Sequence, residues 1–223
     1  MGSLTLFQQT NNDGFPKAAE LIEIQGAHAL EGSDRALFNH LLQHAHDSGL
    51  LGEPDARWEI TFATLLRASS KHESSDRLRE GLRRLRSTEF KVTYQESKGV
   101  WRDYETHLLE FTDTSKGNSE TATVRFGIPR DLRDILARSN RWGRIRCEIS
   151  YSISSKYAIA LYEMICLRTN LDRCVEIIPS RRFRELLGVP PDAYERGDNF
   201  MRFVIKPALL EVNGLSDLGV QVI

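Results

Sequence analysis

The spacing of apolar residues divides the first two thirds of the chain into segments of helical and strand periodicity. Apolar residues recur every four positions between Ser33 and Gly49, which is typical of an amphipathic helix. Helices are predicted from Ser33 to Gly49, from the cap residue Thr61, over 73–87 and over 130–137. Strands are predicted at 58–60, 90–94, 107–111, 121–126 and 145–149. Three helices followed by a hairpin is the order of a winged helix, whose third helix faces DNA.

The last third repeats this order. A helix is predicted from Ser154 to about Asn170, and others over 180–188 and 199–213. Strands are predicted at 175–178 and 220–222. The sequence therefore predicts an α+β fold in two similar units, with segments 73–87 and 199–213 in equivalent places.

The helix over 199–213 has two kinds of face. Phe203, Pro207 and Leu210 recur at i, i+4 and i+7 and so share a face, and Phe203 and Leu210 are predicted to be buried. Pro207 also removes a backbone hydrogen bond and should bend the helix. The polar row consists of Asn199, Arg202 and Lys206. Asparagine reads adenine, arginine reads guanine and lysine neutralises phosphate, so this row is the candidate base reader.

Charge is distributed unevenly, although the net charge is only −1. Residues 61–146 carry 18 Lys and Arg against 12 Asp and Glu. Arginine accounts for most of the cations in the chain, and it suits bidentate contact with phosphate and guanine. Arg79, Arg83 and Arg86 share one face of the helix over 73–87, which predicts phosphate contact. A merely solvated arginine-rich surface is the alternative interpretation.

Two further arginines complete the candidate nucleic-acid-binding set. Arg196 precedes the last helix, and Arg182 lies on the helix before it. The full candidate set is Arg79, Arg83, Arg86, Arg182, Arg196, Asn199, Arg202 and Lys206.

Several other classes of protein are disfavoured by composition and motifs. The 223 residues contain no apolar run long enough to span a bilayer and no signal-peptide pattern at the amino terminus, so we expect a cytoplasmic protein without membrane contact. The three cysteines form no C-x-x-C motif. Neither a phosphate-binding loop nor a G-x-S-x-G motif is found. We expect no enzymatic activity, no cofactor and no metal.

Three segments resemble the second winged-helix domain of iteron-binding plasmid replication initiators. They are SSKYAIALYEMICL (154–167), IIPSRRFRELLGVP (177–190) and NFMRFVIKPALLEVNGLSDLGVQV (199–222). The pairs and triplets that carry the resemblance are Tyr157-Ala158, Leu161-Tyr162-Glu163, Pro207-Ala208 and Glu211-Val212-Asn213. The region from Glu20 to Ala45 also resembles the opening helix of that family.

This resemblance implies two tandem winged-helix domains related by pseudo-symmetry. We expect a flexible tail over 1–19, a first domain over 20–150 for dimerisation and DNA-backbone contact, and a second over 151–223 that reads most bases. The implied partners are double-stranded DNA, as direct origin repeats and the protein's own promoter, a second copy of the chain in a monomer–dimer equilibrium, and the host initiator ATPase and replicative helicase. Because the family continues into a basic wing and a return strand, the chain is expected to be truncated after Ile223.

Two other functions stay open. One is a winged-helix transcription regulator that does not start replication and prefers inverted repeats. The other is a metal-dependent rolling-circle nickase using His44 and His46, with Tyr151, Tyr157 or Tyr162 as nucleophile. The histidine pair falls in a predicted helix, where its rings diverge by about 200°, which argues against the nickase.

Overall fold

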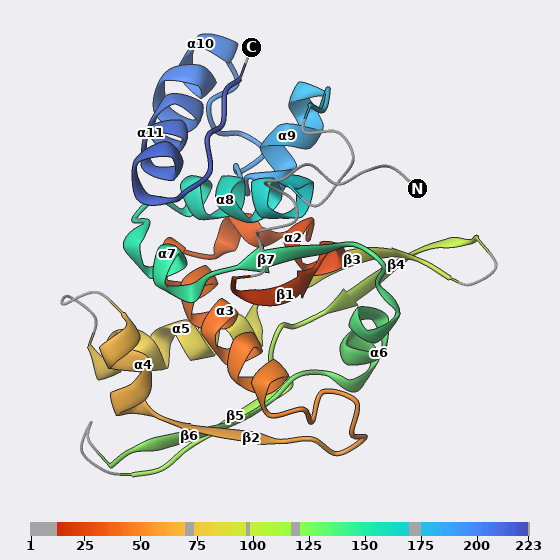
Figure 1. The fold of residues 1–223 in the computed structure, drawn as a ribbon, viewed down its shortest axis with the longest axis vertical. Helices are drawn as coiled ribbons and strands as arrows, with labels where there is room; N and C mark the ends of the chain where they lie inside the picture. Colours follow the sequence, from red (N-terminus) through yellow and green to blue (C-terminus); the bar gives the residue numbers. More distant parts are fainter. Residues whose placement is uncertain (1–12, 70–73, 97–98, 117–120, 170–174, 223) are drawn as a thin grey trace.

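The computed structural model describes residues 13–69, 74–96, 99–116, 121–169 and 175–222 (Figure 1). The first part contains β1 (Phe15–Ala18), α2 (Ala19–Ile22), the 3₁₀ turn η1 (Ala27–Ala29), α3 (Gly32–Asp47), β2 (Trp58–Thr61), α4 (Phe62–Ala68), α5 (Ser75–Ser87), β3 (Phe90–Gln95), β4 (Trp101–Thr106), β5 (Phe111–Thr114), β6 (Thr123–Gly127), α6 (Arg130–Arg138) and β7 (Trp142–Ile145). The rest contains α7 (Cys147–Ser152), α8 (Lys156–Thr169), α9 (Ser180–Leu186), α10 (Gly197–Phe200), the π-helical turn η2 (Met201–Ile205) and α11 (Lys206–Leu215).

An antiparallel sheet in the order β2-β6-β5 forms one end of the first domain (Figure 1). Trp58 pairs with Phe126, and both side chains are buried and stacked. The predicted hairpin is found as β5–β6, but the strand expected at 107–111 begins only at Phe111. The backbone N–H groups of Leu108 and Leu109 instead donate to the carbonyl of Leu85, at 3.2 and 3.3 Å. These two hydrogen bonds hold the two buried leucines against α5 rather than in the sheet.

A second hairpin, β3–β4, projects from the body of the domain (Figure 1). Its first strand matches the strand expected at 90–94, but β4 was not predicted. The residues WRDYET are mostly polar, and Trp101 is exposed, so no apolar alternation marks the strand. Pairing with β3 rather than burial therefore defines β4.

Part of the expected amino-terminal tail is a strand. Residues Phe15–Ala18 form β1, which pairs antiparallel with β7, and Phe15 and Ala18 are buried. The tail expected over 1–19 is therefore wrong for residues 15–19, and residues 1–12 lie outside the described part of the chain. The strand expected at 145–149 is also wrong, because β7 ends at Ile145 and α7 begins at Cys147.

A buried polar cluster connects β1 to the helices behind it. Lys17 Nζ lies 2.8 Å from Glu163 Oε1 of α8 and 2.8 Å from Asn39 Oδ1 of α3. Arg35 of α3 contacts the other oxygen of Glu163 at 3.4 Å. Asn39 Nδ2 also donates to Ser150 Oγ of α7 at 3.2 Å. Charged groups are buried here because each cation faces the same carboxylate.

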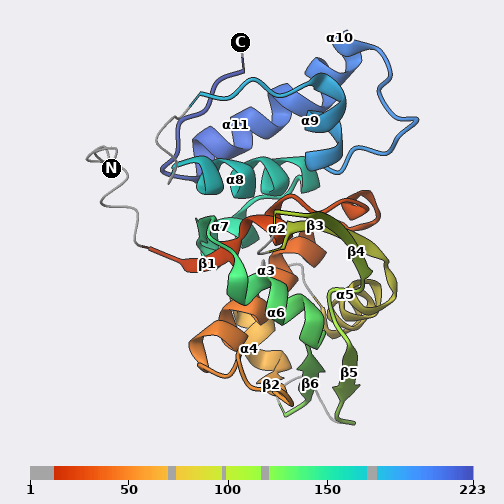
Figure 2. The ribbon, with the colours of Figure 1, turned by 90° about the vertical axis from the view of Figure 1, so that its right-hand side faces the viewer.

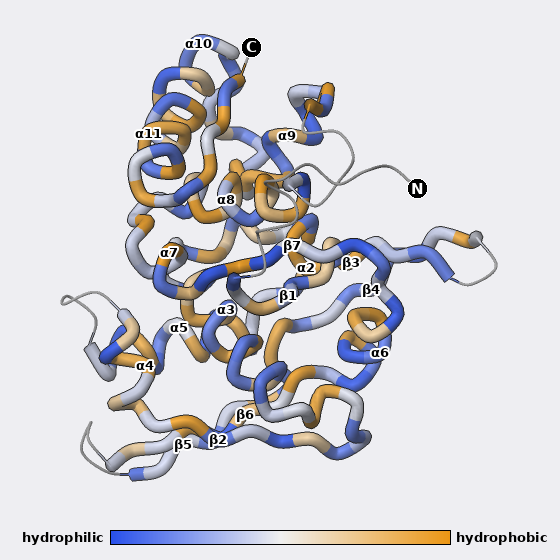
Figure 3. Tube along the Cα trace, viewed as in Figure 1, coloured by the Kyte–Doolittle hydropathy of each residue, from blue (hydrophilic) through white to orange (hydrophobic). Residues whose placement is uncertain are grey.

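Helix α8 lies between the first domain and α11 (Figure 2). Every residue from Ala158 to Met164 is buried, so α8 is covered on more than one side, and Figure 3 shows hydrophobic positions along both α8 and α11. Glu211 of α11 accepts hydrogen bonds from the backbone N–H groups of Ser154 and Ser155, at 2.8 and 3.2 Å, just before α8 begins. This carboxylate fixes how α11 sits over α8, because it binds amide groups that helix α8 leaves unpaired.

The strands expected at 175–178 and 220–222 are not present, since residues 175–222 contain no strand. Asn213 holds the second of these segments through two hydrogen bonds with the backbone of Val220, at 2.8 and 3.0 Å. Val175 and Ile177 are almost fully exposed.

Candidate nucleic-acid interface

Helix α5 presents arginines on its outer side because leucines anchor its inner side. Leu78, Leu82 and Leu85 are buried, as the sequence predicts. Gly81 lies against α3, where an added Cβ would meet Asp34 Oδ1 at 2.9 Å. The absence of a side chain lets α5 approach α3 closely and fixes which face of α5 points outward.

The predicted phosphate-contacting arginines of α5 all face solvent. Arg79, Arg83 and Arg86 are exposed, and Arg79 lies over the ring of Phe62 at 4.7 Å. Arg83 is already engaged, because its Nε and Nη2 donate to Glu80 at 3.0 and 2.5 Å. This bidentate contact lowers the pKa of the Glu80 carboxyl. The acidic partner competes with any phosphate for Arg83.

Arg84, which the sequence did not single out, holds α5 to α3. Its Nε and Nη2 donate to the two carboxylate oxygens of buried Asp34 at 2.7 and 2.9 Å. These hydrogen bonds raise the pKa of Arg84. Asp34 also accepts the backbone N–H of Glu31 at 2.9 Å and so completes a capping box at the start of α3. Arg84 is therefore a structural residue beside the candidate contacts.

The helix expected over 199–213 is found as α10, η2 and α11, from Gly197 to Leu215. Its inner side consists of Phe200, Val204, Ile205, Ala208 and Val212, all buried. The N–H of Lys206 bonds to the carbonyl of Met201, a five-residue step that defines the π-helical turn directly before Pro207. The predicted irregularity at proline is thus a π turn, which accommodates a residue without an N–H group.

The outer side of this helix agrees with one prediction and contradicts another. Arg202 and Lys206 are exposed, and Asn199 is half-buried, as expected for an outward polar row. Phe203 and Leu210, however, were expected to be buried and are 49% and 76% exposed. The apolar row therefore lies beside the polar row on the free face, and a different set of apolar residues, which includes Phe200 and Ile205, supplies the buried face.

Aromatic contacts fix part of this outer face. The Arg202 guanidinium lies over the Phe203 ring, with Cζ 5.2 Å from the ring centroid. The Phe203 ring in turn lies 6.1 Å from that of Tyr194. Tyr194 has a φ of 54°, a left-handed conformation that is uncommon for residues other than glycine. The turn before the helix thus places an aromatic ring beside Phe203.

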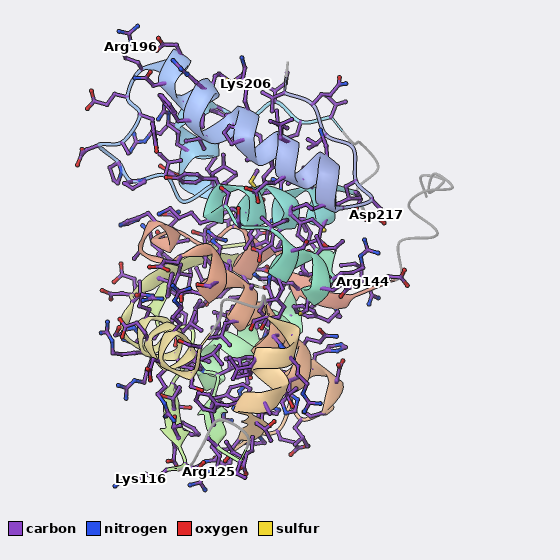
Figure 4. The ribbon with its side chains drawn as sticks, turned by 90° about the vertical axis from the view of Figure 1, so that its left-hand side faces the viewer. Lys116, Arg125, Arg144, Arg196, Lys206 and Asp217 are labelled. Atoms are coloured by element: carbon purple, nitrogen blue, oxygen red, sulfur yellow. The ribbon has the colours of Figure 1, made fainter. Side chains whose placement is uncertain are left out.

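The two remaining predicted arginines are paired with carboxylates. Arg196 donates to both oxygens of Asp198 at 3.1 and 2.8 Å, which lowers the pKa of that carboxyl. Arg182 on α9 lies 3.5 Å from Glu185. Figure 4 shows Arg196 at the start of the helix and Lys206 farther along it, both pointing away from α8. Arg182 is partly buried and lies apart from this outward row.

The two arginine-bearing helices lie on the same side of the molecule. Figures 2 and 4 show α10 above the level of α8 and α5 below it, at the same lateral edge. The helix that carries Arg79, Arg83 and Arg86 thus lies at the same edge as the helix that follows Arg196, although the two helices come from different halves of the chain.

The histidines and tyrosines of the nickase alternative have other neighbours. His44 Nε2 lies 3.0 Å from the carbonyl oxygen of Glu59, and His46 Nδ1 lies 3.1 Å from Asp47. The Tyr162 hydroxyl is buried and accepts the backbone N–H of Arg146 at 3.1 Å. Within the described ranges, no three His, Cys, Asp or Glu side chains gather as a metal site would require. Cys166 is buried, and burial raises the pKa of its thiol to about 12.

Two family models match the chain. The model described as initiator replication protein, WH1, matches residues 16–166, and the model described as initiator Rep protein, WH2, matches residues 181–222. The first alone covers more than half of the 223 residues. The chain belongs to the plasmid replication initiator family. The resemblance in the sequence and the two winged-helix domains it implies are thereby confirmed.

Two solved structures are also similar to this chain. One is the WH1 domain of MSBI1.176, a replication protein isolated from a multiple sclerosis patient, at 11% identity and a TM-score of 0.34, covering 55% of this chain and 85% of that one. Another comprises domains 2 and 3 of RctB, at 15% identity and a TM-score of 0.40, covering 76% of this chain and 68% of that one. No curated protein sequence matches.

The two matches divide the observed elements. The WH1 match contains α3, α4 and α5, then the β3–β4 hairpin and strands β5 and β6, whereas the described residues of the WH2 match contain α9, α10, η2 and α11. The WH1 match runs to residue 166 and so includes most of α8, whereas the domain boundary at 150 stays a prediction. Across the described residues, no helix is both long enough and apolar enough to cross a membrane.

Proposed function

We propose that this initiator binds directly repeated double-stranded DNA at a plasmid origin and promotes opening of the adjacent duplex. The observation that carries the proposal is the cationic side of the last helix, on which Arg202 and Lys206 are exposed and Lys206 points away from α8 (Figure 4). In a winged helix, the third helix enters the major groove and its side chains reach base edges.

The two domains divide the work of binding in this proposal. Arg79, Arg83 and Arg86 of α5 neutralise phosphates and fix the register, which contributes affinity without sequence preference. Asn199, Arg202 and Lys206 read one segment of each repeat. Arg182 and Arg196 give up their carboxylate partners for phosphate contacts.

Binding energy alone drives the proposed mechanism. Contacts summed over adjacent repeats favour a bent or unpaired form of neighbouring A·T-rich DNA. The chain itself is not an enzyme and holds no cofactor or metal in this proposal. The host initiator ATPase and the replicative helicase perform the steps that consume nucleotide in the cytoplasm.

Self-association supplies the proposed control of copy number. By resemblance to the family, monomers bind the origin repeats, and dimers bind the initiator's own promoter and repress it. A dimer with two-fold symmetry matches an inverted repeat, whereas monomers match direct repeats.

Footprinting on the DNA upstream of the initiator's own gene tests the proposal. We expect protection at direct repeats spaced by about two helical turns, together with a separate inverted repeat at the promoter. Protection of an inverted repeat alone would favour a transcription regulator. Cleavage of one strand that depends on Mg²⁺ or Mn²⁺ would instead support the nickase.

A further inference from the structure

An apolar strip runs along the exposed side of the last helix. It consists of Phe203 in the π-helical turn η2 and of Pro207 and Leu210 in α11, all three of which are exposed. Phe203 is 49% and Leu210 76% exposed. Large apolar side chains that adjoin one another at the surface of a folded domain mark a contact site more often than isolated ones do.

Cations are interleaved with this strip. Lys206 lies three residues after Phe203 and four before Leu210, so it lies between them on the same face. The guanidinium of Arg202 covers one side of the Phe203 ring. A partner that binds this face must therefore offer negative charge to the cations and apolar groups to Phe203 and Leu210.

The major groove of A·T-rich DNA has this combination. Each thymine presents a C5-methyl group beside hydrogen-bond acceptors, and phosphates border the groove. A purely apolar protein surface would leave Lys206 buried without a counter-charge, which is costly.

Resting on the proposed DNA-binding function, we propose that Phe203 and Leu210 determine specificity by packing against thymine methyl groups in the groove that this helix enters. The Tyr194 ring lies 6.1 Å from the Phe203 ring, and the Arg202 guanidinium lies over the same ring, so neighbours hold the Phe203 side chain in place before DNA binds. Phe203 and Leu210 read two different thymines, because they are seven residues, or about two helical turns, apart along the axis.

Replacing thymine by deoxyuridine tests this directly, because uracil lacks only the methyl group. Each thymine of a footprinted repeat is replaced in turn, and the affinity of the full chain is measured by titration. We expect a loss of about three- to fivefold at two positions, the factor that corresponds to one buried methylene-sized group. Phe203→Ala should remove the difference between thymine and uracil at one position, and Leu210→Ala at the other.

Leu215→Ala is the matched control. Leu215 is an exposed leucine of the same helix outside the strip, so its replacement should keep the wild-type preference for thymine. Equal affinity of the wild-type chain for thymine and uracil at every position would overturn the inference while leaving the proposed function intact. Loss of self-association in Phe203→Ala, with thymine preference unchanged, would assign the strip to a second copy of the chain. If the wild-type chain formed no sequence-specific complex, both proposals would be wrong.

Discussion

Lys17 and Glu163 form an ion pair of 2.8 Å in the interior of the molecule, although 146 residues separate them. The pair joins β1 to α8, the helix on which α11 rests. Arg35 contacts the same carboxylate at 3.4 Å, so the cluster contains two cations and one anion. Burial lowers the pKa of Lys17, and the attraction of Glu163 opposes this effect. The Glu163 carboxylate is thus the counter-charge for both buried cations.

We predict that Glu163→Gln destabilises the fold far more than Lys17→Met. The first change leaves two buried cations without a counter-charge, which should lower the free energy of unfolding by about 3–5 kcal/mol. Lys17→Met leaves Arg35 paired with Glu163, with no net charge, and should lower the free energy of unfolding by less. Urea unfolding of both variants measures the difference, and equal losses would contradict this account of the cluster.

A second prediction concerns acid stability. Burial, together with the nearby His44, lowers the pKa of His40 below its ordinary value of 6.5, and His40 Nδ1 lies 3.0 Å from the Tyr151 hydroxyl. The unfolded chain therefore binds a proton at His40 more readily than the folded chain does. This contribution to stability is complete above pH 6.5 and is lost as the pH falls through 6.5 toward the folded-state value.

Replacing the histidine isolates this effect. The free energy of unfolding should fall less between pH 7.5 and 5.5 in His40→Gln than in the wild type, because carboxylates titrate alike in both proteins. An identical decline in the two proteins would show that His40 carries no part of the acid sensitivity.

The long helices α3, α5 and α8 were predictable because their apolar positions are local, whereas the short helices α2 and α7 were not predicted. The leucine stripe of α5 and the periodicity of α3 and α8 can be read from a few turns of sequence, and each helix was found. The strand β1 was not predictable in this way. Lys17 is a polar residue in a polar stretch, and the carboxylate that permits its burial lies 146 residues away.

The orientation of the last helix shows a second limit. Its sequence contains two apolar rows, one with Phe203 and Leu210 and one with Val204, Ala208 and Val212, and periodicity alone does not rank them. The row with Val204, Ala208 and Val212 is the buried one, together with Phe200 and Ile205, and the π turn changes the helical phase between the two halves of the helix.

Residues that carry the family resemblance mostly hold the framework together. Tyr162 binds the backbone of Arg146, Glu163 neutralises the buried cations, and Glu211 binds the amides before α8. A resemblance based on such residues identifies the fold well, but it leaves the DNA-contacting residues to be found by exposure and charge.

The ion pair of Arg83 with Glu80 leads to a third prediction. Arg83→Ala should weaken DNA binding similarly for all sequences and lower the salt dependence by about one unit, as for the loss of one phosphate contact. Glu80→Gln should strengthen DNA binding and raise its salt dependence, because it removes a negative charge and frees Arg83 for phosphate. Titrations at several salt concentrations on specific and random DNA measure both slopes. A loss confined to the specific site would mean that Arg83 reads bases.

The last prediction concerns Arg202, whose guanidinium is held over the Phe203 ring and points to the free side of the helix. If it binds guanine through two hydrogen bonds, Arg202→Ala should cost about 1–3 kcal/mol and relax preference at one base pair. Folding should be almost unchanged, since exposed substitutions move stability by about 0.5 kcal/mol or less.

Arg181→Ala is the matched control, because Arg181 is 93% exposed on α9, outside this helix. It should retain full discrimination among single-base variants of the repeat. If Arg202→Ala and Arg181→Ala changed discrimination among the single-base variants equally, Arg202 would not read a base. A large fall in melting temperature for Arg202→Ala alone would show that the contact of Arg202 with Phe203 stabilises the fold.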